Sequence, residues 1–172
     1  MSNLGLIHVY YGTGKGKTTA ALGLALRACG AGLSVGIVQF MKGYPYSEVK
    51  PLLALEGVEL VQTGSPDYIY KGKEKEMDIK EARRGLDVAK AFLSAGKDLV
   101  ILDEISVAVD FGLISEKEVL QIMDSKPEGV ELVLTGRDPS EAILDRADYL
   151  SEIISRRHPY DKGVLSREGI DH

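Results

Sequence analysis

The strongest constraint on the fold of this chain is a glycine- and lysine-rich segment with the sequence Gly12-Thr13-Gly14-Lys15-Gly16-Lys17-Thr18-Thr19. The apolar run at residues 6–11 before it predicts a strand, and the composition of residues 17–29 after it predicts a helix. This order of strand, loop and helix is the context that a phosphate-binding loop requires. The segment therefore predicts that the chain binds the phosphate groups of a nucleotide where this helix begins.

The residue types in this loop contribute to phosphate binding in different ways. Glycines let successive backbone N–H groups converge on an anion without a clash from Cβ, and the helix N-terminus adds a partial positive charge. We expect Lys17 to place a full charge on the distal phosphates and Thr18 to offer its hydroxyl to Mg²⁺. Tyr11 stands where the strict pattern has its first glycine, and Lys15 is an additional lysine. The alternative is a flexible turn with two solvated lysines.

Two acidic residues follow a second apolar run. Residues 99–103 form this run, which ends in Asp103 and continues into Glu104. An acid at the carboxyl end of such a strand lies near the nucleotide in α/β nucleotide-binding proteins. We expect Asp103 to orient Mg²⁺ through a water or Thr18, and Glu104 to contact the metal, a water or the nucleoside. A helix N-cap is the alternative for acids at this position.

Two cations follow other predicted strands. Arg137 lies after the run at 131–135, and Lys42 after the run at 35–40. An arginine at such a strand end has the geometry to bind a phosphate through two parallel hydrogen bonds. We include both cations in the predicted nucleotide site, with a surface salt bridge as the alternative for each.

Apolar runs alternate with longer amphipathic segments along the chain. We predict strands at residues 6–11, 35–40, 58–62, 99–103, 131–135 and 150–155, and helices at 17–29, 47–55, 78–95, 116–124 and 140–146. Several of the strands are apolar throughout, which suits strands that are covered on both faces. The pattern predicts an α/β fold with a mostly parallel sheet of about six strands and helices on both faces. The 172 residues fit a single domain over 1–172. Residues 64–77 are predicted to form a surface loop.

Composition limits the partners of this chain. The net charge of −5 argues against a large nucleic-acid interface, and no apolar run is long enough to span a bilayer. The residues from Met1 carry no secretion signal, and the single Cys29 forms no disulfide within the chain, which fits a reducing compartment. We therefore expect a cytoplasmic protein that binds neither nucleic acid nor membrane. The sequence has no zinc-ligand spacing and no Gly-x-Ser-x-Gly motif.

The order of these motifs resembles that of the ATP:corrinoid adenosyltransferases of the CobA/BtuR type. The similar stretches are residues 12–21, 38–43, 102–104, 134–137 and 158–171, so the resemblance extends from about Leu6 to the C-terminus. The first glycine of the phosphate loop is missing from that family too. The resemblance implies a P-loop NTPase-type, RecA-like sheet in a homodimer. It also implies transfer of the 5′-deoxyadenosyl group of ATP to the cobalt(I) of a reduced corrinoid, with tripolyphosphate as the leaving group, in adenosylcobalamin biosynthesis or salvage.

The resemblance also implies roles for individual residues. Cobalt(I) is itself a strong nucleophile, so the protein needs no nucleophilic side chain and instead positions the reactants and stabilises the departing charge. Lys15, Lys17, Arg137 and Mg²⁺ are the implied groups for that charge, and the implied catalytic residues are Lys17, Glu104 and Arg137. The implied partner, besides a second copy of the chain, is an electron-donating flavoprotein.

The corrinoid side of the implied site is carried by aromatic residues. The family has an aromatic pair in the loop after the third strand, which helps hold the corrinoid. Tyr68 and Tyr70 occupy the matching region, and we expect them to pack on the corrin ring. A surface loop with two tyrosines is the alternative. His172 stands where relatives commonly have an aromatic residue, so we do not expect the aromatic packing of the family there.

Two other functions fit the same motifs. A phosphoryl-transfer kinase or NTPase would use the same phosphate loop and leave ADP and phosphate, or a phosphorylated acceptor. An ATP-dependent corrinoid carrier or regulator would bind both ligands without forming a cobalt–carbon bond.

Overall fold

The computed structural model describes residues 5–44 and 46–171 of the chain. Its strands are β1 (Ile7–Tyr11), β2 (Val35–Phe40), β3 (Val58–Thr63), β4 (Leu99–Asp103), β5 (Glu131–Thr135) and β6 (Tyr149–Glu152). Its helices are α1 (Lys17–Gly30), α2 (Val49–Leu53), α3 (Glu76–Ser94), α4 (Ile105–Asp110), α5 (Glu116–Asp124), α6 (Glu141–Leu144) and a 3₁₀ helix, η1 (Pro159–Lys162). The six strands form one sheet in the order β3-β2-β4-β5-β1-β6, and every neighbouring pair is parallel. The predicted α/β fold class is confirmed.

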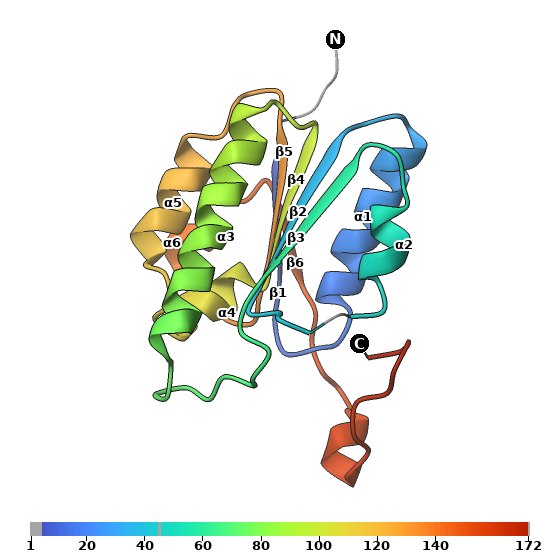
Figure 1. Ribbon diagram of the computed structural model, residues 1–172, viewed down its shortest axis with the longest axis vertical. Helices are drawn as coiled ribbons and strands as arrows, with labels where there is room; N and C mark the ends of the chain where they lie inside the picture. Colours follow the sequence, from blue (N-terminus) through green and yellow to red (C-terminus); the bar gives the residue numbers. More distant parts are fainter. Residues whose placement is uncertain (1–4, 45, 172) are drawn as a thin grey trace.

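Helices cover both faces of the sheet, with α1 and α2 on one face and α3 to α6 on the other (Figure 1). This explains why β4 is apolar at successive positions. Side chains of a strand point alternately to opposite faces, and Leu99 and Ile101 join the core under α1, whereas Val100 and Leu102 join the core under α3 to α6. A strand between two helical layers therefore has no face that tolerates polar residues.

Two helical segments were not predicted from the sequence. Helix α4 begins directly after Glu104, so its apolar residues follow the apolar strand β4 without a turn signal between them. The 3₁₀ helix η1 lies in the tail, where Pro159 occupies its first position and the ring nitrogen Nδ1 of His158 accepts a hydrogen bond from the N–H of Tyr160.

The bounds of several predicted elements were wrong, most of all those of β6, α2 and α6. Strand β6 ends at Glu152 rather than at residue 155, because the carbonyl of Ile153 accepts a hydrogen bond from the N–H of Gly14 instead of pairing in the sheet. Helices α2 and α6 are shorter than the predicted 47–55 and 140–146. Helix α5 has the predicted bounds of 116–124.

All strands run in the same direction, so their carboxyl ends meet at one edge of the sheet. The phosphate loop, the loops after β2, β3, β4 and β5, and the tail after β6 all leave from this edge. In Figure 1 it is the lower edge, with the 64–75 loop and the tail extending below it. Ligands of open parallel sheets bind outside the carboxyl ends of the strands, so we expect the ligand-binding site at this edge.

Two of the sequence expectations concern Met1 and His172, which lie outside the described residues. Within the described part of the chain, none of the helices has the length and apolar character needed to cross a bilayer.

Candidate functional site

The phosphate loop connects β1 to α1 and is fixed by backbone hydrogen bonds. The N–H of Gly12 donates to the carbonyl of Arg137 at 2.9 Å, and the N–H of Gly14 donates to the carbonyl of Ile153 at 2.7 Å. A Cβ at Gly14 would lie 2.8 Å from that same carbonyl oxygen, so only glycine fits this approach. Gly16 caps α1 with a φ of 117°, a left-handed conformation that favours glycine. The backbone path of the loop therefore favours glycine at both positions, Gly14 and Gly16.

The two lysines of the loop lie in different surroundings. Lys17 is buried, and its Nζ donates to the carbonyl of Gly14 at 2.8 Å. Burial and, to a smaller extent, the charge of Arg137 lower the pKa of Lys17, whereas Glu104 raises it. Lys15 is exposed and binds the tail of the chain. Thr13 and Thr19 are exposed as well.

Asp103 is completely buried, and four side chains donate hydrogen bonds to its carboxylate. The hydroxyls of Thr18 and Thr135 donate to Oδ1 at 2.8 and 2.7 Å. Lys42 donates to Oδ2 at 2.8 Å, and Gln39 donates to the same oxygen at 3.3 Å. Burial alone would lower the pKa of Lys42, but the charge of Asp103 and the hydrogen bond to it outweigh burial, and the pKa of Lys42 is raised. Lys42 therefore keeps its positive charge despite burial, and the hydrogen bond to Asp103 positions the Thr18 hydroxyl.

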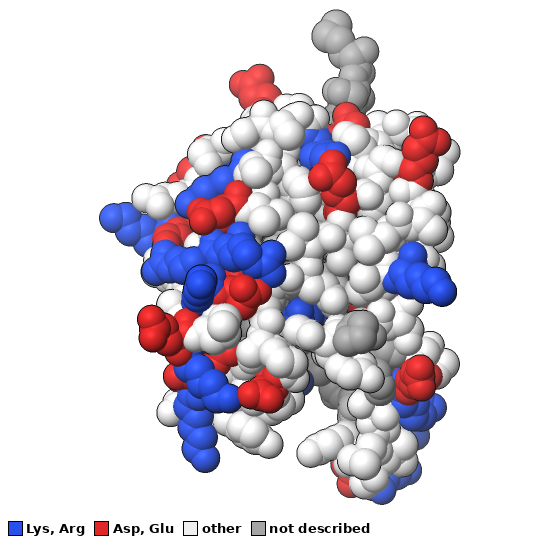
Figure 2. All heavy atoms as spheres, in the orientation of Figure 1, with Lys and Arg blue, Asp and Glu red and all other residues white. Residues whose placement is uncertain are grey.

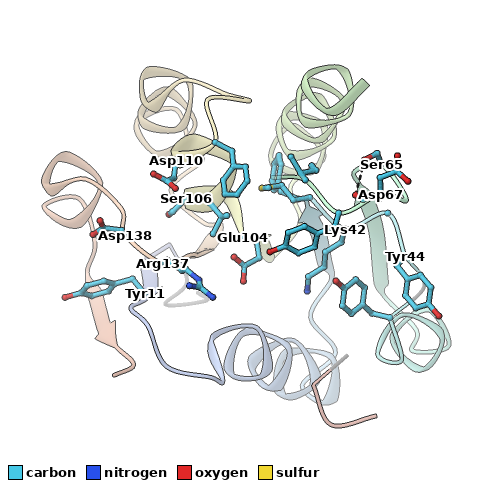
Figure 3. A pocket seen from close by; sticks show the side chains of 18 of the residues that line it. Tyr11, Lys42, Tyr44, Ser65, Asp67, Glu104, Ser106, Asp110, Arg137 and Asp138 are labelled. Atoms are coloured by element: carbon cyan, nitrogen blue, oxygen red, sulfur yellow. Dashed lines mark hydrogen bonds between the residues drawn. The ribbon is translucent and has the colours of Figure 1, made fainter. Parts of the chain in front are cut away.

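Glu104 differs from Asp103 in its backbone conformation and in the hydrogen bonding of its carboxylate. Its backbone has φ 62° and ψ 22°, a strained conformation for a residue with a side chain. No hydrogen bond to its carboxylate is recorded among residues 5–44 and 46–171, and burial followed by the nearby charge of Asp103 raises the pKa of Glu104. In Figure 3 its carboxylate extends into the open space between Arg137 and Lys42. Such strained residues cluster at sites of function.

Two clefts lie over the carboxyl edge of the sheet and meet at this carboxylate. The larger, of about 1060 Å³, lies between the loops after β2, β3, β4 and β5. The smaller, of about 860 Å³, is lined by Lys15 to Thr19, by α1 and α2, and by the tail. Glu104, Lys42 and Tyr46 line both. Figure 2 shows the surface hollowed between two lobes at the lower edge of the molecule.

The predicted aromatic residues lie at the larger cleft in unequal ways. Tyr68 lines this cleft and is 81% exposed. Tyr70 is not among the lining residues, and its ring instead contacts the Tyr68 ring at a centroid distance of 5.0 Å. The structure therefore brings one of the two predicted tyrosines to the cleft directly and the other through its partner.

The remaining predicted residues also gather at these clefts. Arg137 lines the larger cleft, and no ion pair is recorded for it within the described residues, so the alternative of a surface salt bridge is not what the structure contains. Lys42 does form an ion pair, but a nearly buried one, since its side chain is 11% exposed and that of Asp103 is 0% exposed. Its ammonium also lies 4.9 Å from the centre of the Tyr46 ring.

Several residues at the clefts were missed by sequence reasoning. Those that line the clefts are Tyr46, Glu48, Ser106, Val107, Asp110, Phe111 and the tail residues Gly169, Ile170 and Asp171. Gln39, which is buried and lines neither cleft, was missed as a donor to Asp103. Tyr46 lies four residues after Lys42, and Ser106 and Val107 lie two and three residues after Glu104, so closeness to a predicted site residue was a usable signal for them. The tail residues lie in the 158–171 stretch that resembles the family, but their approach to the phosphate loop depends on folding of the chain.

The donor set of the site determines what kind of metal ion it fits. No group of three or more His, Cys, Asp or Glu side chains able to hold a metal occurs in the part of the chain that the structure describes. A divalent cation here would thus take most ligands from a substrate, which is how Mg²⁺ binds in nucleotide sites, with one or two protein oxygens. The Thr18 hydroxyl and the Glu104 carboxylate supply oxygens of that type at the smaller cleft.

This chain is similar to known proteins over nearly its whole length. The family model described as ATP:corrinoid adenosyltransferase BtuR/CobO/CobP matches residues 3–172. A corrinoid adenosyltransferase of Escherichia coli (strain K12) is 38% identical over 170 residues, which cover 98% of this chain and 86% of that protein. The corrinoid adenosyltransferase CobA of Salmonella typhimurium (strain LT2) is 37% identical over 170 residues, with the same 98% and 86% coverage. A corrinoid adenosyltransferase of Pseudomonas aeruginosa is 29% identical over 170 residues, covering 97% of this chain and 83% of that protein.

Proposed function

The chain belongs to the ATP:corrinoid adenosyltransferase family, and on that premise we propose that it transfers the 5′-deoxyadenosyl group of ATP to the cobalt(I) of a reduced corrinoid and releases tripolyphosphate. The protein is a transferase whose substrates are ATP and a corrinoid. One observation carries the finer proposal. The cleft over the phosphate loop and the larger cleft meet at Glu104, Lys42 and Tyr46, and a direct transfer needs two binding sites that meet at the reacting carbon.

The reaction places few demands on side-chain chemistry. The electron pair of cobalt(I) attacks C5′, a cobalt–carbon bond forms, and the C5′–oxygen bond breaks with its electron pair passing to the triphosphate. No proton has to be removed from the nucleophile, so the protein needs no general base at the reacting atoms. Its contribution is to hold C5′ against cobalt, since positioning of two reactants is worth about 7–11 kcal/mol.

The phosphate loop is proposed to bind the triphosphate and to stabilise it as it leaves. The loop amides near the start of α1 and the ammonium of Lys17 face the smaller cleft, and Lys15 lies beside them. Arg137 approaches from the larger cleft, where the departing negative charge develops. Lys17 has to exchange the carbonyl of Gly14 for a phosphate oxygen. Burial lowers the pKa of Lys17, and a bound phosphate would stabilise its charged form.

The residues at the smaller cleft also fit a magnesium ion carried by the nucleotide. The Thr18 hydroxyl and the Glu104 carboxylate would hold it together with phosphate oxygens. The ion would neutralise part of the charge of the leaving tripolyphosphate. Four donors occupy both oxygens of the Asp103 carboxylate, whose side chain is 0% exposed, so we assign Asp103 a positioning role toward Thr18 and Lys42 in place of direct ligation.

The larger cleft is proposed to bind the corrinoid. Its volume of about 1060 Å³ and its partly apolar walls, which include Phe111 and Ile69, suit a flat macrocycle with polar substituents. Tyr68 would pack on the corrin, with Tyr70 supporting the Tyr68 ring.

Four further proposals concern the protein in the cell. We place it in the cytoplasm as one domain, acting as a homodimer. An electron-donating flavoprotein would supply the cobalt(I) state. These proposals rest on the family to which the chain belongs.

An anaerobic optical assay tests the proposed function. The protein is incubated with ATP, Mg²⁺ and chemically reduced cobalamin, and the spectrum is followed before and after exposure to light. A photolabile alkylcobalamin supports the transfer. Loss of ATP without that product supports a kinase or NTPase, and a corrinoid spectral change with intact ATP supports a carrier, and either outcome would overturn the proposal.

A further inference from the structure

The tail of the chain returns to the phosphate loop and binds one of its lysines. The Nζ of Lys15 donates a hydrogen bond to the carbonyl of Ile170 at 2.8 Å and forms an ion pair with the carboxylate of Asp171. These residues are 155 and 156 positions away from Lys15 in the sequence. In Figure 1 the tail, after η1, ends beside the first turn of α1.

Asp171 is held in place by its own turn of the tail. The backbone N–H and the side-chain Nε of Arg167 each donate to Oδ2 of Asp171 at 3.0 Å, which leaves Oδ1 for Lys15. The hydrogen bond from Lys15, followed by the contacts with Arg167, lowers the pKa of Asp171. The tail therefore presents a preformed carboxylate to the loop, not a side chain that happens to lie nearby.

The position of this carboxylate is inside the cleft that the nucleotide is proposed to occupy. Gly169, Ile170 and Asp171 line the smaller cleft together with Lys15 and Lys17. A carboxylate and a phosphate oxygen make the same charge-assisted hydrogen bond to an ammonium group. Both therefore compete for Lys15, and a polyphosphate chain has the larger charge.

We propose that Asp171 is an internal counter-anion of the phosphate loop, which occupies Lys15 until a polyphosphate chain displaces it and so releases residues 163–171 from the loop. The inference rests on the proposed function in one respect, namely that Lys15 contacts the phosphates of ATP. It goes further in assigning the tail a role in the affinity of the loop for phosphate chains. The tail would fall back onto Lys15 when tripolyphosphate leaves.

Calorimetric titration of Asp171→Asn with ATP and, separately, with tripolyphosphate tests this competition. Because exposed ion pairs are weak, removal of the competing charge should lower the dissociation constant of tripolyphosphate about two- to fivefold. Asp161→Asn is the matched control, since Asp161 is an exposed tail carboxylate for which no ion pair is recorded among the described residues. It removes the same charge and should leave the affinity unchanged.

A double-mutant cycle assigns the effect to Lys15. In a Lys15→Met background, Asp171→Asn should give no further gain in affinity, because the competition has lost its target. A gain of the same size in both backgrounds would mean that Asp171 acts through general repulsion, and the inference would be wrong.

Hydrogen exchange measures the release of the tail itself. Peptides that cover residues 164–171 should exchange faster when tripolyphosphate is bound than in the free wild-type protein. Slower or unchanged exchange would show that the tail closes over the ligand or ignores it, and would overturn the inference. Binding by the wild type without a gain in Asp171→Asn overturns this inference alone, whereas no binding of ATP or tripolyphosphate by the wild type overturns the proposed function and this inference with it.

Discussion

The two walls of the site, the phosphate loop (residues 12–19) and the tyrosine loop (residues 64–75), differ in how they are held in place. The phosphate loop is hydrogen-bonded through its backbone to the segments after β5 and after β6, and Lys17, its proposed catalytic lysine, is buried. The tyrosine loop is largely exposed. One surface ion pair, Lys71 with Asp110, joins it to α4, and another, Lys75 with Asp67, lies within the loop. Buried, bonded groups hold a small charged ligand at fixed positions, whereas an exposed loop adapts to the outline of a large one.

This contrast teaches where substitutions should act. Changes in the phosphate loop should abolish a specific interaction with a phosphate group and have large effects on both ATP binding and turnover. Changes in the tyrosine loop should remove contact area and act on the corrinoid alone.

The largest effect is expected from Lys17→Ala. Lys17 is the buried cation of the loop, and loss of a charge that stabilises the leaving group costs about 10²-fold or more in turnover. The rate of alkylcobalamin formation at saturating ATP measures it. A variant with nearly wild-type activity would show that the triphosphate lies elsewhere.

Glu104→Gln should come next, with a loss of about tenfold in kcat/KM for ATP, or roughly 1.4 kcal/mol. The substitution keeps the shape of a side chain that lines both clefts but removes its charge. Asp110→Asn is the control, because Asp110 is an exposed carboxylate that lines only the larger cleft. Equal losses in the two variants would mean that the Glu104 carboxylate, at the junction of the two clefts, has no special role.

Tyr68→Ala should raise the KM for cobalamin several-fold, up to about tenfold, and leave ATP affinity unchanged, because loss of an aromatic contact of about 0.5–1.5 kcal/mol acts only where the ring packs. Tyr70→Ala, which removes a ring that touches Tyr68 but does not line the cleft, should have a smaller effect. Steady-state kinetics with each substrate varied in turn separates the two. A weakened ATP affinity in Tyr68→Ala would break the division between the walls.

The smallest effect is expected from Lys71→Ala. Its ion pair with Asp110 joins the tyrosine loop to α4 at 2.6 Å, but the two side chains are 61% and 51% exposed. Such surface pairs contribute between about 0 and 1 kcal/mol, so the KM for cobalamin should change by less than about fivefold. A larger change would mean that the loop has to be held in this position for the corrinoid to bind.

The sequence predicted the phosphate-loop wall far better than the opposite one. Glycine spacing, strand ends and the pair Asp103 and Glu104 are local signals, because the backbone chemistry that they serve is local. The structure gathers most of the residues predicted from these signals around two adjoining clefts at the carboxyl edge of the sheet. The parallel sheet and the coverage of both faces were predicted from the alternation of apolar runs, whereas the strand order was not predicted.

What the sequence could not predict depends on contacts between distant segments. The four donors around Asp103 come from α1, from β2 and the loop after it, and from β5, and no single stretch of sequence reports that Lys42 is used to neutralise a buried acid. The pairing of Lys15 with Asp171 joins opposite ends of the described chain. Such pairs are set by tertiary packing, which a local pattern does not encode.

The most direct test of the central claim is a crystal structure of the protein with a non-reactive ATP analogue and a corrinoid. The account predicts the triphosphate along residues 12–19, with C5′ facing the junction at Glu104 and the corrinoid in the larger cleft. A nucleotide bound in the opposite sense, with its γ-phosphate at the junction and C5′ turned away, would contradict adenosyl transfer at this site and favour phosphoryl transfer.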